Sequence, residues 1–355
     1  MIPPGSTIGI VGGGQLGRML SIAAAQLGYK CHIFDPHEHP PAADVAAHVT
    51  RGAFGDVDAI RRFGASVDIA TYEFENLPVE PLDVLGAKLL PSTRSLAIAQ
   101  DRAREKAFIE GTGARVARWR AVESRAEVEA VAAEFGPPIV LKTRRYGYDG
   151  KGQAWIRSAA AVQSAWTSIG EEPAVAEAGI DFIAEFSVIV ARWNDGRHAF
   201  WDSPENEHGE GILRRSTVPC SEAVAGQVEE AREATIRIAE ALGHVGVLTV
   251  EFFASADGPM VNEIAPRVHN SGHWTIEGAV TSQFEQHVRA ICGLPPGVTG
   301  LTRGGAVMEN LIGSDVERWP ELVAERGAHV HIYGKGEARP GRKMGHVTRV
   351  SRRPL

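Results

Sequence analysis

The feature that most constrains the fold is a glycine-rich turn near the N-terminus, set between an apolar strand and a helix. Residues 7–35 read as the strand TIGIV, the turn GGGQLG, the helix RMLSIAAAQLG and the strand KCHIFD. Because crossovers between parallel strands are right-handed, this pattern predicts a βαβ unit in a parallel sheet. The apolar runs DIATYEF (68–74) and AKLLPS (87–92) alternate with helical stretches and are predicted to be further strands of that sheet.

The same turn carries a fingerprint that several ligands would explain. Gly12, Gly14 and Gly17 fit G-x-G-x-x-G, and Asp35 ends the next strand, as in dinucleotide-binding folds. Glycines at a tight βα turn also serve any ligand that needs close backbone approach, or only the turn itself. A dinucleotide, another anionic or small ligand, and simple turn geometry all stay open on this motif alone.

Length and charge narrow the class of protein. At 355 residues the chain exceeds a usual single core, so we expect several domains. The 44 acidic residues outnumber the 37 basic ones, which argues against a general binder of nucleic acid. The three cysteines lack zinc or disulfide spacing, no apolar run approaches the roughly 18 residues of a membrane span, and the N-terminus lacks a basic leader start. We therefore expect a cytoplasmic protein.

A second glycine-rich loop has the composition of a phosphate site. Lys142 ends the apolar strand PPIVLKT, and the loop GYDGKGQ at 147–153 follows. Backbone N–H groups of such a loop can surround phosphates while a lysine supplies charge. The Walker pattern G-x-x-x-x-G-K-[ST] is absent, which disfavours a P-loop enzyme. A plain hairpin turn is the competing explanation.

Two glutamates on neighbouring strands are predicted to share a cation. Glu251 in LTVEFF and Glu263 in MVNEIA are symmetric about Asp257, so an antiparallel hairpin would place them opposite one another. Like charges at that spacing repel unless a cation lies between them, and oxygen ligands near a polyphosphate select Mg²⁺. A chance pair of exposed glutamates is the alternative. Asn262 should face the other side of its strand unless the backbone is bulged.

Together these strings resemble the ATP-grasp superfamily and, within it, the 5-(carboxyamino)imidazole ribonucleotide synthases. The similarity runs from GGGQLGRM to GRKMGH, and NEIAPRVHNSGHWT at 262–275 is its most specific string. It implies an α/β and α+β fold with a Rossmann-like pre-ATP-grasp domain (1–105), a lid subdomain (106–180), a catalytic subdomain (181–300) and a C-terminal strand-rich segment (301–355). It also implies ATP-dependent carboxylation of 5-aminoimidazole ribonucleotide by bicarbonate, through carboxyphosphate, in purine biosynthesis.

The resemblance further implies roles for single residues. Arg267 would handle bicarbonate or its phosphate, Lys151 would act in catalysis, and Glu251 and Glu263 would hold Mg²⁺. The implied ATP site comprises Arg102, Lys142, Gly147, Tyr148, Asp149, Gly150, Lys151, Gly152, Gln153, Glu177, Ala178, Gly179, Ile180, Glu185, His208, Asn262 and Glu263. The implied ribonucleotide site comprises Gln15, Leu16, Glu73, His269, Asn270, Lys335, Arg342 and Lys343.

Two rival activities share parts of this pattern. A sister ATP-grasp ligase uses formate and glycinamide ribonucleotide, and a nicotinamide-dependent dehydrogenase would rest on G-x-G-x-x-G alone. The resemblance also implies a homodimer that passes its unstable product to a following mutase.

Overall fold

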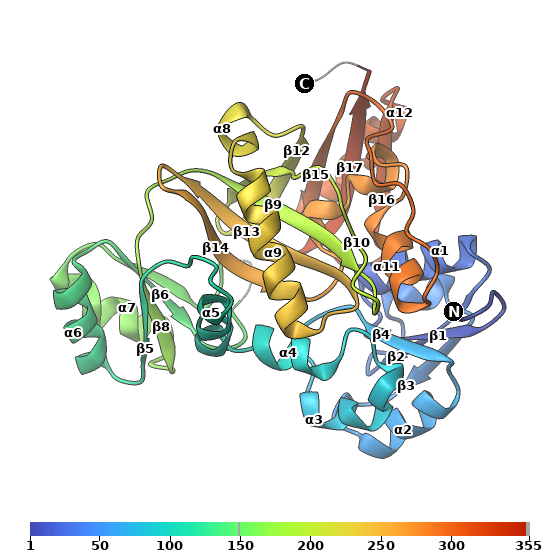
Figure 1. Ribbon diagram of the computed structural model, residues 1–355, viewed down its shortest axis with the longest axis horizontal. Coiled ribbons are helices and arrows are strands. Elements are labelled where there is room, and N and C mark those ends of the chain that lie inside the picture. The colour runs from blue at the N-terminus through green and yellow to red at the C-terminus, as the bar shows by residue number, and fades with distance from the viewer. Residues whose placement is uncertain (148–149, 353–355) are drawn as a thin grey trace.

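The computed structural model of the chain describes residues 1–147 and 150–352, and these residues form three separate sheets (Figure 1). One sheet is parallel and N-terminal, one is a small antiparallel sheet that we call the lid, and one is a large antiparallel sheet. This arrangement confirms the predicted combination of an α/β unit with α+β units. None of the described helices is both long and apolar enough to cross a membrane.

The N-terminal sheet has the strand order β3-β2-β1-β4, with all pairs parallel. Its strands are β1 (Thr7–Val11), β2 (Lys30–Asp35), β3 (His48–Arg51) and β4 (Ile69–Tyr72). The helical segments are α1 (Gln15–Gln26), η1 (Pro41–Val45), α2 (Val57–Ala65), α3 (Val79–Leu82), η2 (Asp83–Lys88) and α4 (Thr93–Ala99). The predicted βαβ unit is therefore confirmed.

The strand predicted at 87–92 is wrong. Residues up to Lys88 belong to the 3-10 helix η2, and of residues 87–92, all of which the structure describes, only Leu89 forms a bridge, with Ala70. Gly86 adopts a positive φ of 52°, and Pro91 lacks the N–H that a ladder needs. Too few residues are left between them for a strand.

The lid sheet has the order β5-β8-β6-β7 and its own apolar core, which includes Trp166 and Leu141. Its elements are β5 (Trp119–Val122), α6 (Arg125–Phe135), β6 (Ile139–Thr143), β7 (Gln153–Ile156), η3 (Ala159–Ala161), α7 (Val162–Ser168) and β8 (Ala174–Ala178). The helix α5 (Arg102–Gly111) leads into it, and the lid projects from the rest of the molecule at the left of Figure 1. A separate core of this kind lets the lid move as a unit.

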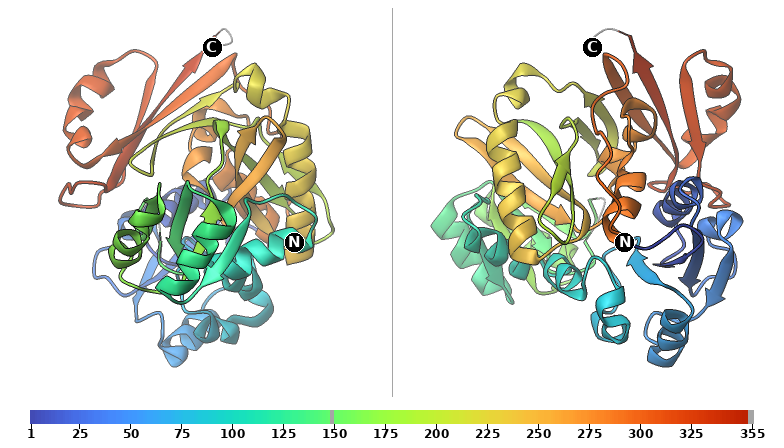
Figure 2. Two further views of the ribbon diagram at one scale, coloured as in Figure 1. Left: turned by 90° about the vertical axis from the view of Figure 1, so that its left-hand side faces the viewer. Right: turned by 45° about the vertical axis from the view of Figure 1, so that its right-hand side comes forward.

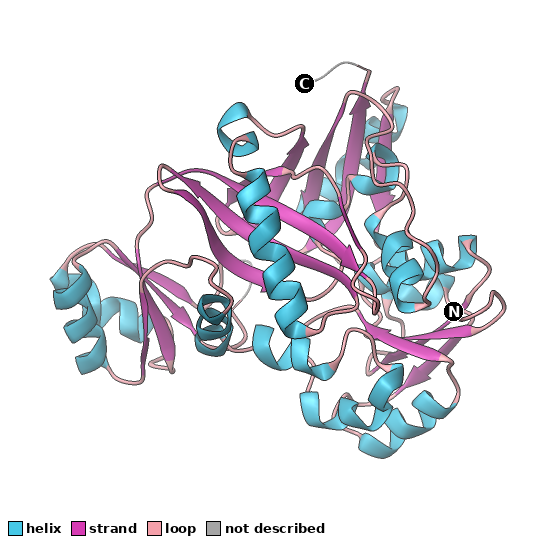
Figure 3. Cartoon of the chain, in the orientation of Figure 1, coloured by secondary structure: helices cyan, strands magenta, loops and turns pink. Residues whose placement is uncertain are grey.

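The large sheet follows the order β14-β13-β9-β11-β12-β15-β17-β16, with β10 also paired to β9. Its strands are β9 (Phe182–Arg192), β10 (His198–Phe200), β11 (Glu205–Gly209), β12 (Ile212–Val218), β13 (Gly246–Ser255), β14 (Gly258–Ala265), β15 (Gly305–Ile312), β16 (Ala328–Ile332) and β17 (Lys343–Ser351). Its helical segments are α8 (Glu222–Ala225), α9 (Val228–Leu242), η4 (Asn270–Gly272), α10 (Thr275–Gly278), α11 (Gln283–Ile291), η5 (Gly313–Arg318) and α12 (Trp319–Ala324). The helix α9 crosses one face of the sheet (Figure 3).

The N-terminal domain is fixed to the large sheet through α1 and α11. Leu20 of α1 and Phe284 of α11 belong to one apolar core that also contains Trp274 and Ile189. Burying side chains of this size stabilises by about 1.5–3 kcal/mol each. Both views of Figure 2 show the N-terminal domain in the lower part of the molecule and the C-terminal strands at its top. Gln15 and Leu16 at the start of α1 thereby come to line the same cavity as Ile264 and Ala265 at the end of β14.

Candidate active site

Two adjoining cavities lie where the lid, the N-terminal domain and the large sheet meet. The first, which we call the lid cavity, measures about 300 Å³, and the second, the interdomain cavity, about 930 Å³. Six residues line both cavities and form what we call the junction: Arg102, Lys151, Glu263, His269, Asn270 and Lys343. A group bound in one cavity can therefore meet a group bound in the other.

Buried charges at one wall of the lid cavity leave an excess of positive charge. The Lys142 and Lys106 ammonium nitrogens lie 3.2 and 3.1 Å from Glu177 carboxylate oxygens, and Lys142 also donates to Asn262 Oδ1 at 3.3 Å. Burial opposes ionisation, yet the two ammonium groups lower the pKa of Glu177 to about 2. Two cations against one anion favour an anionic ligand here. Lys106 was not predicted, although it follows Arg102 by one helical turn on α5.

The opposite side of the lid cavity combines an ion pair with apolar surface. His208 Nδ1 lies 3.1 Å from Glu185 Oε2. Burial would lower the pKa of His208, but its hydrogen bond to Glu185 and the nearby carboxylates raise it. Phe182 and Phe253 stack with their ring centroids 4.7 Å apart, and Ile180 lines the same cavity. The cavity thus offers a flat apolar surface beside polar groups, as a base with an attached sugar requires.

The predicted opposition of the two glutamates is confirmed. Glu251 of β13 pairs directly with Glu263 of β14, and the register shifts immediately afterwards. This bulge brings Asn262 to the lining of the lid cavity. Asn262 therefore lies on the same side of its strand as Glu263, as the sequence allowed only for a bulged strand. Burial and the charge of Glu263 raise the pKa of Glu251 to about 7. Burial would also raise the pKa of Glu263, but Arg102, whose Nη1 donates to this carboxylate at 3.0 Å, lowers it.

The protein offers a cation only a few side-chain ligands. Among the described residues, no three or more His, Cys, Asp or Glu side chains gather as a metal site. Two carboxylates facing one another suit a hard cation that keeps water and phosphate oxygens as its other ligands. The raised pKa of Glu251 records a repulsion that such a cation would offset. The pair therefore fits Mg²⁺ held together with a phosphate.

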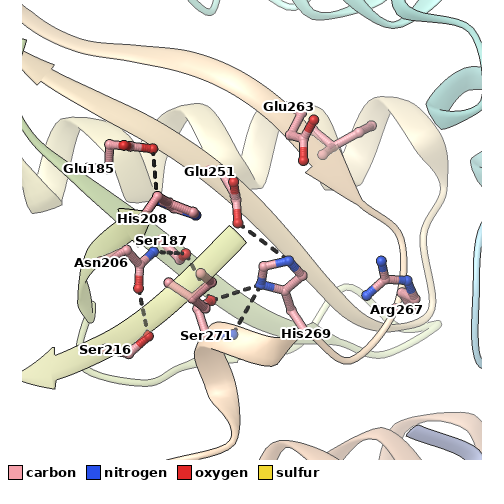
Figure 4. A network of polar contacts seen from close by, with 12 residues as sticks. Glu185, Ser187, Asn206, His208, Ser216, Glu251, Glu263, Arg267, His269 and Ser271 are labelled. Carbon is pink, nitrogen blue, oxygen red and sulfur yellow. Dashed lines mark hydrogen bonds and ion pairs between the residues drawn. The ribbon is translucent and has the colours of Figure 1, made fainter. Parts of the chain in front are cut away.

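His269 is fixed at the junction through its backbone, and through its ring as Figure 4 shows. The Gln283 side chain accepts from the His269 N–H at 2.9 Å and donates to its carbonyl at 2.6 Å. The ring nitrogen Nδ1 lies 2.9 Å from Ser271 Oγ, and Nε2 lies 3.3 Å from Glu251 Oε1. Burial, followed by the charge of Arg267, lowers the pKa of His269 well below its usual value, so the ring is neutral.

Arg267 lines the interdomain cavity and is oriented by a carboxylate that the sequence motifs did not single out. Its Nε and Nη2 donate to the two carboxylate oxygens of Glu75, the second at 2.9 Å, and its Nη1 donates to the Val268 carbonyl at 3.0 Å. An arginine has five N–H donors, so two are left for a ligand. Glu75 is the second acidic residue of TYEFEN, and this short spacing after a strand was the available signal.

The glycine turn already holds anions of the protein itself. Glu73 accepts from the Gly14 and Gly17 N–H groups at 2.5 and 2.9 Å, and Asp35 accepts from the Gly13 N–H at 2.8 Å. These are the donors that a dinucleotide pyrophosphate would need. The Glu73 and Asp35 carboxylates take that place, so the dehydrogenase interpretation loses its anion site.

Most residues predicted from the sequence fall into one of the two cavities. The lid cavity is lined by Arg102, Lys142, Gly150, Lys151, Gln153, Glu177, Ala178, Ile180, Glu185, His208, Glu251, Asn262 and Glu263. The interdomain cavity is lined by Gln15, Leu16, Glu73, Gly147, Arg267, His269, Asn270, Lys335, Arg342 and Lys343. The Asn270 amide is buried, and among the residues that the structure describes neither its nitrogen nor its oxygen has a hydrogen-bond partner, as expected of a group that binds a ligand.

Four predicted ATP residues differ from the rest. Gly152 and Gly179 line neither cavity: a Cβ on Gly152 would lie 2.5 Å from Thr143 Oγ1, and one on Gly179 would lie 2.9 Å from Pro138. Their role visible here is close packing of the backbone. Tyr148 and Asp149 lie outside the described residues.

Glu105 is a further lining residue of the interdomain cavity that sequence reasoning missed. It is 2% exposed and accepts the Ile264 N–H at 2.7 Å, on the outer edge of β14 next to Glu263. Burial and the charge of Glu263 raise the pKa of Glu105 to about 8. It thus secures the strand that carries one of the paired carboxylates.

Comparison with known proteins covers nearly the whole chain. Family models match for a ribonucleotide synthetase preATP-grasp domain (residues 5–100), an ATP-grasp domain (107–284) and a phosphoribosylaminoimidazole carboxylase C-terminal domain (306–354). The N5-carboxyaminoimidazole ribonucleotide synthase of Brucella melitensis is 47% identical over 100% of this chain and 99% of its own length. That of Bacillus subtilis is 42% identical over 98% of this chain and 92% of its own.

Solved structures of similar proteins agree with this. An ADP complex of an N5-carboxyaminoimidazole ribonucleotide synthetase superposes with a TM-score of 0.94 at 41% identity, covering 99% of this chain and 94% of the other. The Aspergillus clavatus N5-carboxyaminoimidazole synthase, in complex with ADP and 5-aminoimidazole ribonucleotide, superposes with a TM-score of 0.92 at 29% identity, covering 98% and 94%.

Proposed function

The chain belongs to the N5-carboxyaminoimidazole ribonucleotide synthases, ATP-dependent ligases of the ATP-grasp superfamily, and we propose that it carboxylates 5-aminoimidazole ribonucleotide at the junction of its two cavities. The product is N5-carboxyaminoimidazole ribonucleotide, formed in purine biosynthesis with release of ADP and phosphate. The observation that carries the proposal is the set of six residues shared by the two cavities.

The lid cavity would hold ATP. Lys142 and Glu177 line one wall of it, and Lys106 is buried against Glu177, so the three groups carry one positive charge in excess, which suits a polyphosphate. The apolar surface of Ile180 and the stacked pair of aromatic rings would receive adenine. The glycine loop from Gly147 to Gln153 would fold over the phosphates, and Lys151, which lines both cavities, would balance charge on the transferring phosphoryl group.

Glu251 and Glu263 would hold Mg²⁺, because their mutual repulsion is relieved by a cation and their side of the lid cavity faces the junction. When bound, the ion supplies charge neutralisation at phosphate oxygens. Arg102 donates to Glu263 and is suited to turn towards phosphate once that carboxylate holds the cation.

The interdomain cavity would hold the ribonucleotide. Lys335, Arg339 and Arg342 line one end of it in the connection between β16 and β17, where a 5′-phosphate would find fork-shaped donors. Gln15 and Leu16 line its N-terminal wall at the start of α1. Asn270 and His269 lie at the junction, where the reacting amine must arrive.

The proposed reaction has two steps, phosphoryl transfer to bicarbonate and transfer of the carboxyl group to the amine. A bicarbonate oxygen, held by the two remaining N–H donors of Arg267, attacks the γ-phosphorus, and the bond to the ADP oxygen breaks. The exocyclic amine of the ribonucleotide attacks the carbon of the resulting carboxyphosphate and the C–O bond to the phosphate breaks. Alternatively that C–O bond breaks first and the amine attacks the CO₂ released. On either route the nitrogen loses a proton and the bridging oxygen leaves with the phosphate. Closure of the lid would keep water from an intermediate that hydrolyses readily.

We further infer a cytoplasmic homodimer that passes its unstable product to a following mutase; membership of the family supports this. Sedimentation of the purified enzyme would show the dimer, and a single-chain mass would contradict it.

A coupled assay of ADP release tests the proposed function. The full rate should require ATP, bicarbonate and 5-aminoimidazole ribonucleotide together, since phosphoryl transfer is productive only when the junction is filled from both sides. A rate that instead required formate and glycinamide ribonucleotide would assign the sister activity.

A further inference from the structure

A line of buried polar side chains runs beneath the junction and ends at His269 (Figure 4). Ser216 Oγ donates to Asn206 Oδ1 at 2.8 Å, and Asn206 Nδ2 donates to Ser187 Oγ at 2.7 Å. The Ser187 and Ser271 hydroxyl oxygens lie 2.8 Å apart, and Ser271 Oγ lies 2.9 Å from His269 Nδ1. Three of the four partners are 0% exposed and Asn206 is 6% exposed, so water does not compete for these bonds.

The direction of the line is fixed at its two ends. The main-chain N–H of Ser271 points at His269 Nδ1 at 3.3 Å, and a main-chain donor cannot be turned into an acceptor. A proton on Nδ1 would face this N–H, so Nδ1 must be the acceptor. At the other end, Asn206 gives its amide hydrogen to Ser187. The hydrogen of a serine hydroxyl can rotate, so either of Ser187 and Ser271 can donate to the other. Because Nδ1 accepts, Ser271 must turn to donate to it, and Ser187, which accepts from Asn206, then donates to Ser271.

We propose that Ser216, Asn206, Ser187 and Ser271 form a one-way hydrogen-bond relay that holds His269 in the tautomer with its proton on Nε2. In this tautomer each bond of the line has one donor and one acceptor. Nε2–H then donates to Glu251 Oε1, 3.3 Å away. The four relay residues are positioning residues, because they act on the junction only through His269.

The tautomer of His269 matters because the residue is held in place and cannot shift away from Glu251. Gln283 clamps both backbone polar groups of His269, and Gly272 is packed so closely that a Cβ on it would lie 2.5 Å from Gln283 Oε1. With the proton on Nδ1, the lone pair of Nε2 would face Glu251 and would repel its carboxylate whenever Glu251 is ionised. That repulsion would displace Glu251 from its place opposite Glu263. Partners that orient a ligand in this way typically change activity about 10–100-fold when they are altered.

The tautomer is measurable in the free protein. In ¹⁵N-histidine-labelled enzyme, two-bond proton–nitrogen correlations distinguish a protonated ring nitrogen from an unprotonated one, and a His269→Asn variant identifies the signals of His269. The relay predicts an unprotonated Nδ1 and a protonated Nε2. A His269 ring with its proton on Nδ1 would overturn the proposal, whatever any variant does.

Asn206→Asp tests the direction of the relay. A carboxylate has nearly the same shape as the amide but only accepts, so Ser187 would turn to donate to it and Ser271 would turn to donate to Ser187. His269 Nδ1 would keep the Ser271 N–H but lose the hydroxyl hydrogen, so its nitrogen signal should shift. The turnover number should fall about 10–100-fold while the Michaelis constant for ATP changes less than about twofold. Wild-type signals together with wild-type turnover in this variant would contradict the relay.

Asn310→Asp is the matched control. Asn310 is also buried in the large sheet, where it donates to the Leu213 carbonyl at 2.9 Å, and no hydrogen bond within the described chain joins it to the relay. This variant should lose thermal stability but keep the signals of His269 and the turnover of the folded enzyme. An equal loss of turnover in both variants would reduce Asn206 to a structural residue. The effect on turnover rests on the proposed function, whereas the tautomer does not, so the two can fail separately.

Discussion

Single buried charges in the two cavities differ in what surrounds them, and this decides what each can do. Glu177 is balanced by two lysines and stays ionised, whereas Glu251 faces another carboxylate and holds its proton up to a pKa of about 7. Glu105 holds its proton still higher, to about 8. Glu177 and its two lysines keep their charges with or without a ligand. Glu251 and Glu105 need a nearby cation to be fully ionised at neutral pH.

The first prediction concerns Glu263→Gln. Removing this charge should lower turnover by about two orders of magnitude, because only one carboxylate is left to hold the cation. The fold should survive, since Gln keeps the shape of the side chain. Steady-state ADP release at increasing Mg²⁺ measures the effect, with the thermal melt as the check on folding. Turnover within about threefold of the wild type would remove Glu263 from the cation site.

The second prediction concerns the proton on Glu105. Its pKa rises from the usual value of 4.5 to about 8 on folding, so between these values the folded chain holds a proton that the unfolded chain has lost. The free energy of unfolding should therefore fall as the pH rises through this window, and level off above it. Glu105→Gln keeps the acceptor for the Ile264 N–H and has no proton to lose.

Urea unfolding of ligand-free enzyme at pH 6 and pH 9 measures this difference. The free energy of unfolding should fall from pH 6 to pH 9 by at least about 1 kcal/mol more in the wild type than in Glu105→Gln. Equal pH dependence in the two proteins would mean that Glu105 ionises normally.

At the scale of elements, the main-chain N–H groups of the glycine turn bind a side chain of the protein where other folds bind a ligand. The start of α1 meets the Glu73 carboxylate instead of a phosphate, and this contact joins α1 to the loop after β4. The bulge in the β13–β14 hairpin has a comparable effect, since it turns Asn262 and Glu263 to the same cavity.

The third prediction concerns Gly14→Ala. A Cβ at this position would lie 2.5 Å from Glu73 Oε1, so the carboxylate or the turn must shift. We expect a loss of about 1–3 kcal/mol in the free energy of unfolding and weaker ribonucleotide binding, with ATP binding little changed. Gly111→Ala is the control, because it lies at the end of α5 with nothing within 4 Å of its Cβ. Calorimetric titration of both variants decides, and equal ribonucleotide affinities would contradict the assigned role of the turn.

At the scale of the whole molecule, the parts of the site that the sequence predicted are those set by local spacing. The glycine turn, Lys142 near the end of β6 and the opposed glutamates of one hairpin depend on strand periodicity and turn position alone. The partners of those residues were not predictable. Glu75 and Arg267 meet across 192 residues of sequence, and Glu105 meets Ile264 across 159, because the N-terminal domain packs on the large sheet.

The relay beneath His269 was invisible for the same reason. Serine and asparagine on β9, β11 and η4 carry no spacing that distinguishes a buried line from a solvated face. Only the pairing of β11 with both β9 and β12 brings them into contact. The mistaken strand at 87–92 is a local error. The apolar run predicted a strand, but the positive φ of Gly86 and the missing N–H of Pro91 interrupt it.

The central claim is that phosphoryl transfer from the lid cavity and carboxylation in the interdomain cavity meet at one junction through bicarbonate. Enzyme supplied with ATP, 5-aminoimidazole ribonucleotide and freshly dissolved ¹⁸O-bicarbonate tests it by mass analysis of the released phosphate. We predict one labelled oxygen in each phosphate formed, because a bicarbonate oxygen attacks the γ-phosphorus and leaves with it. Unlabelled phosphate released alongside carboxylated product would contradict the account.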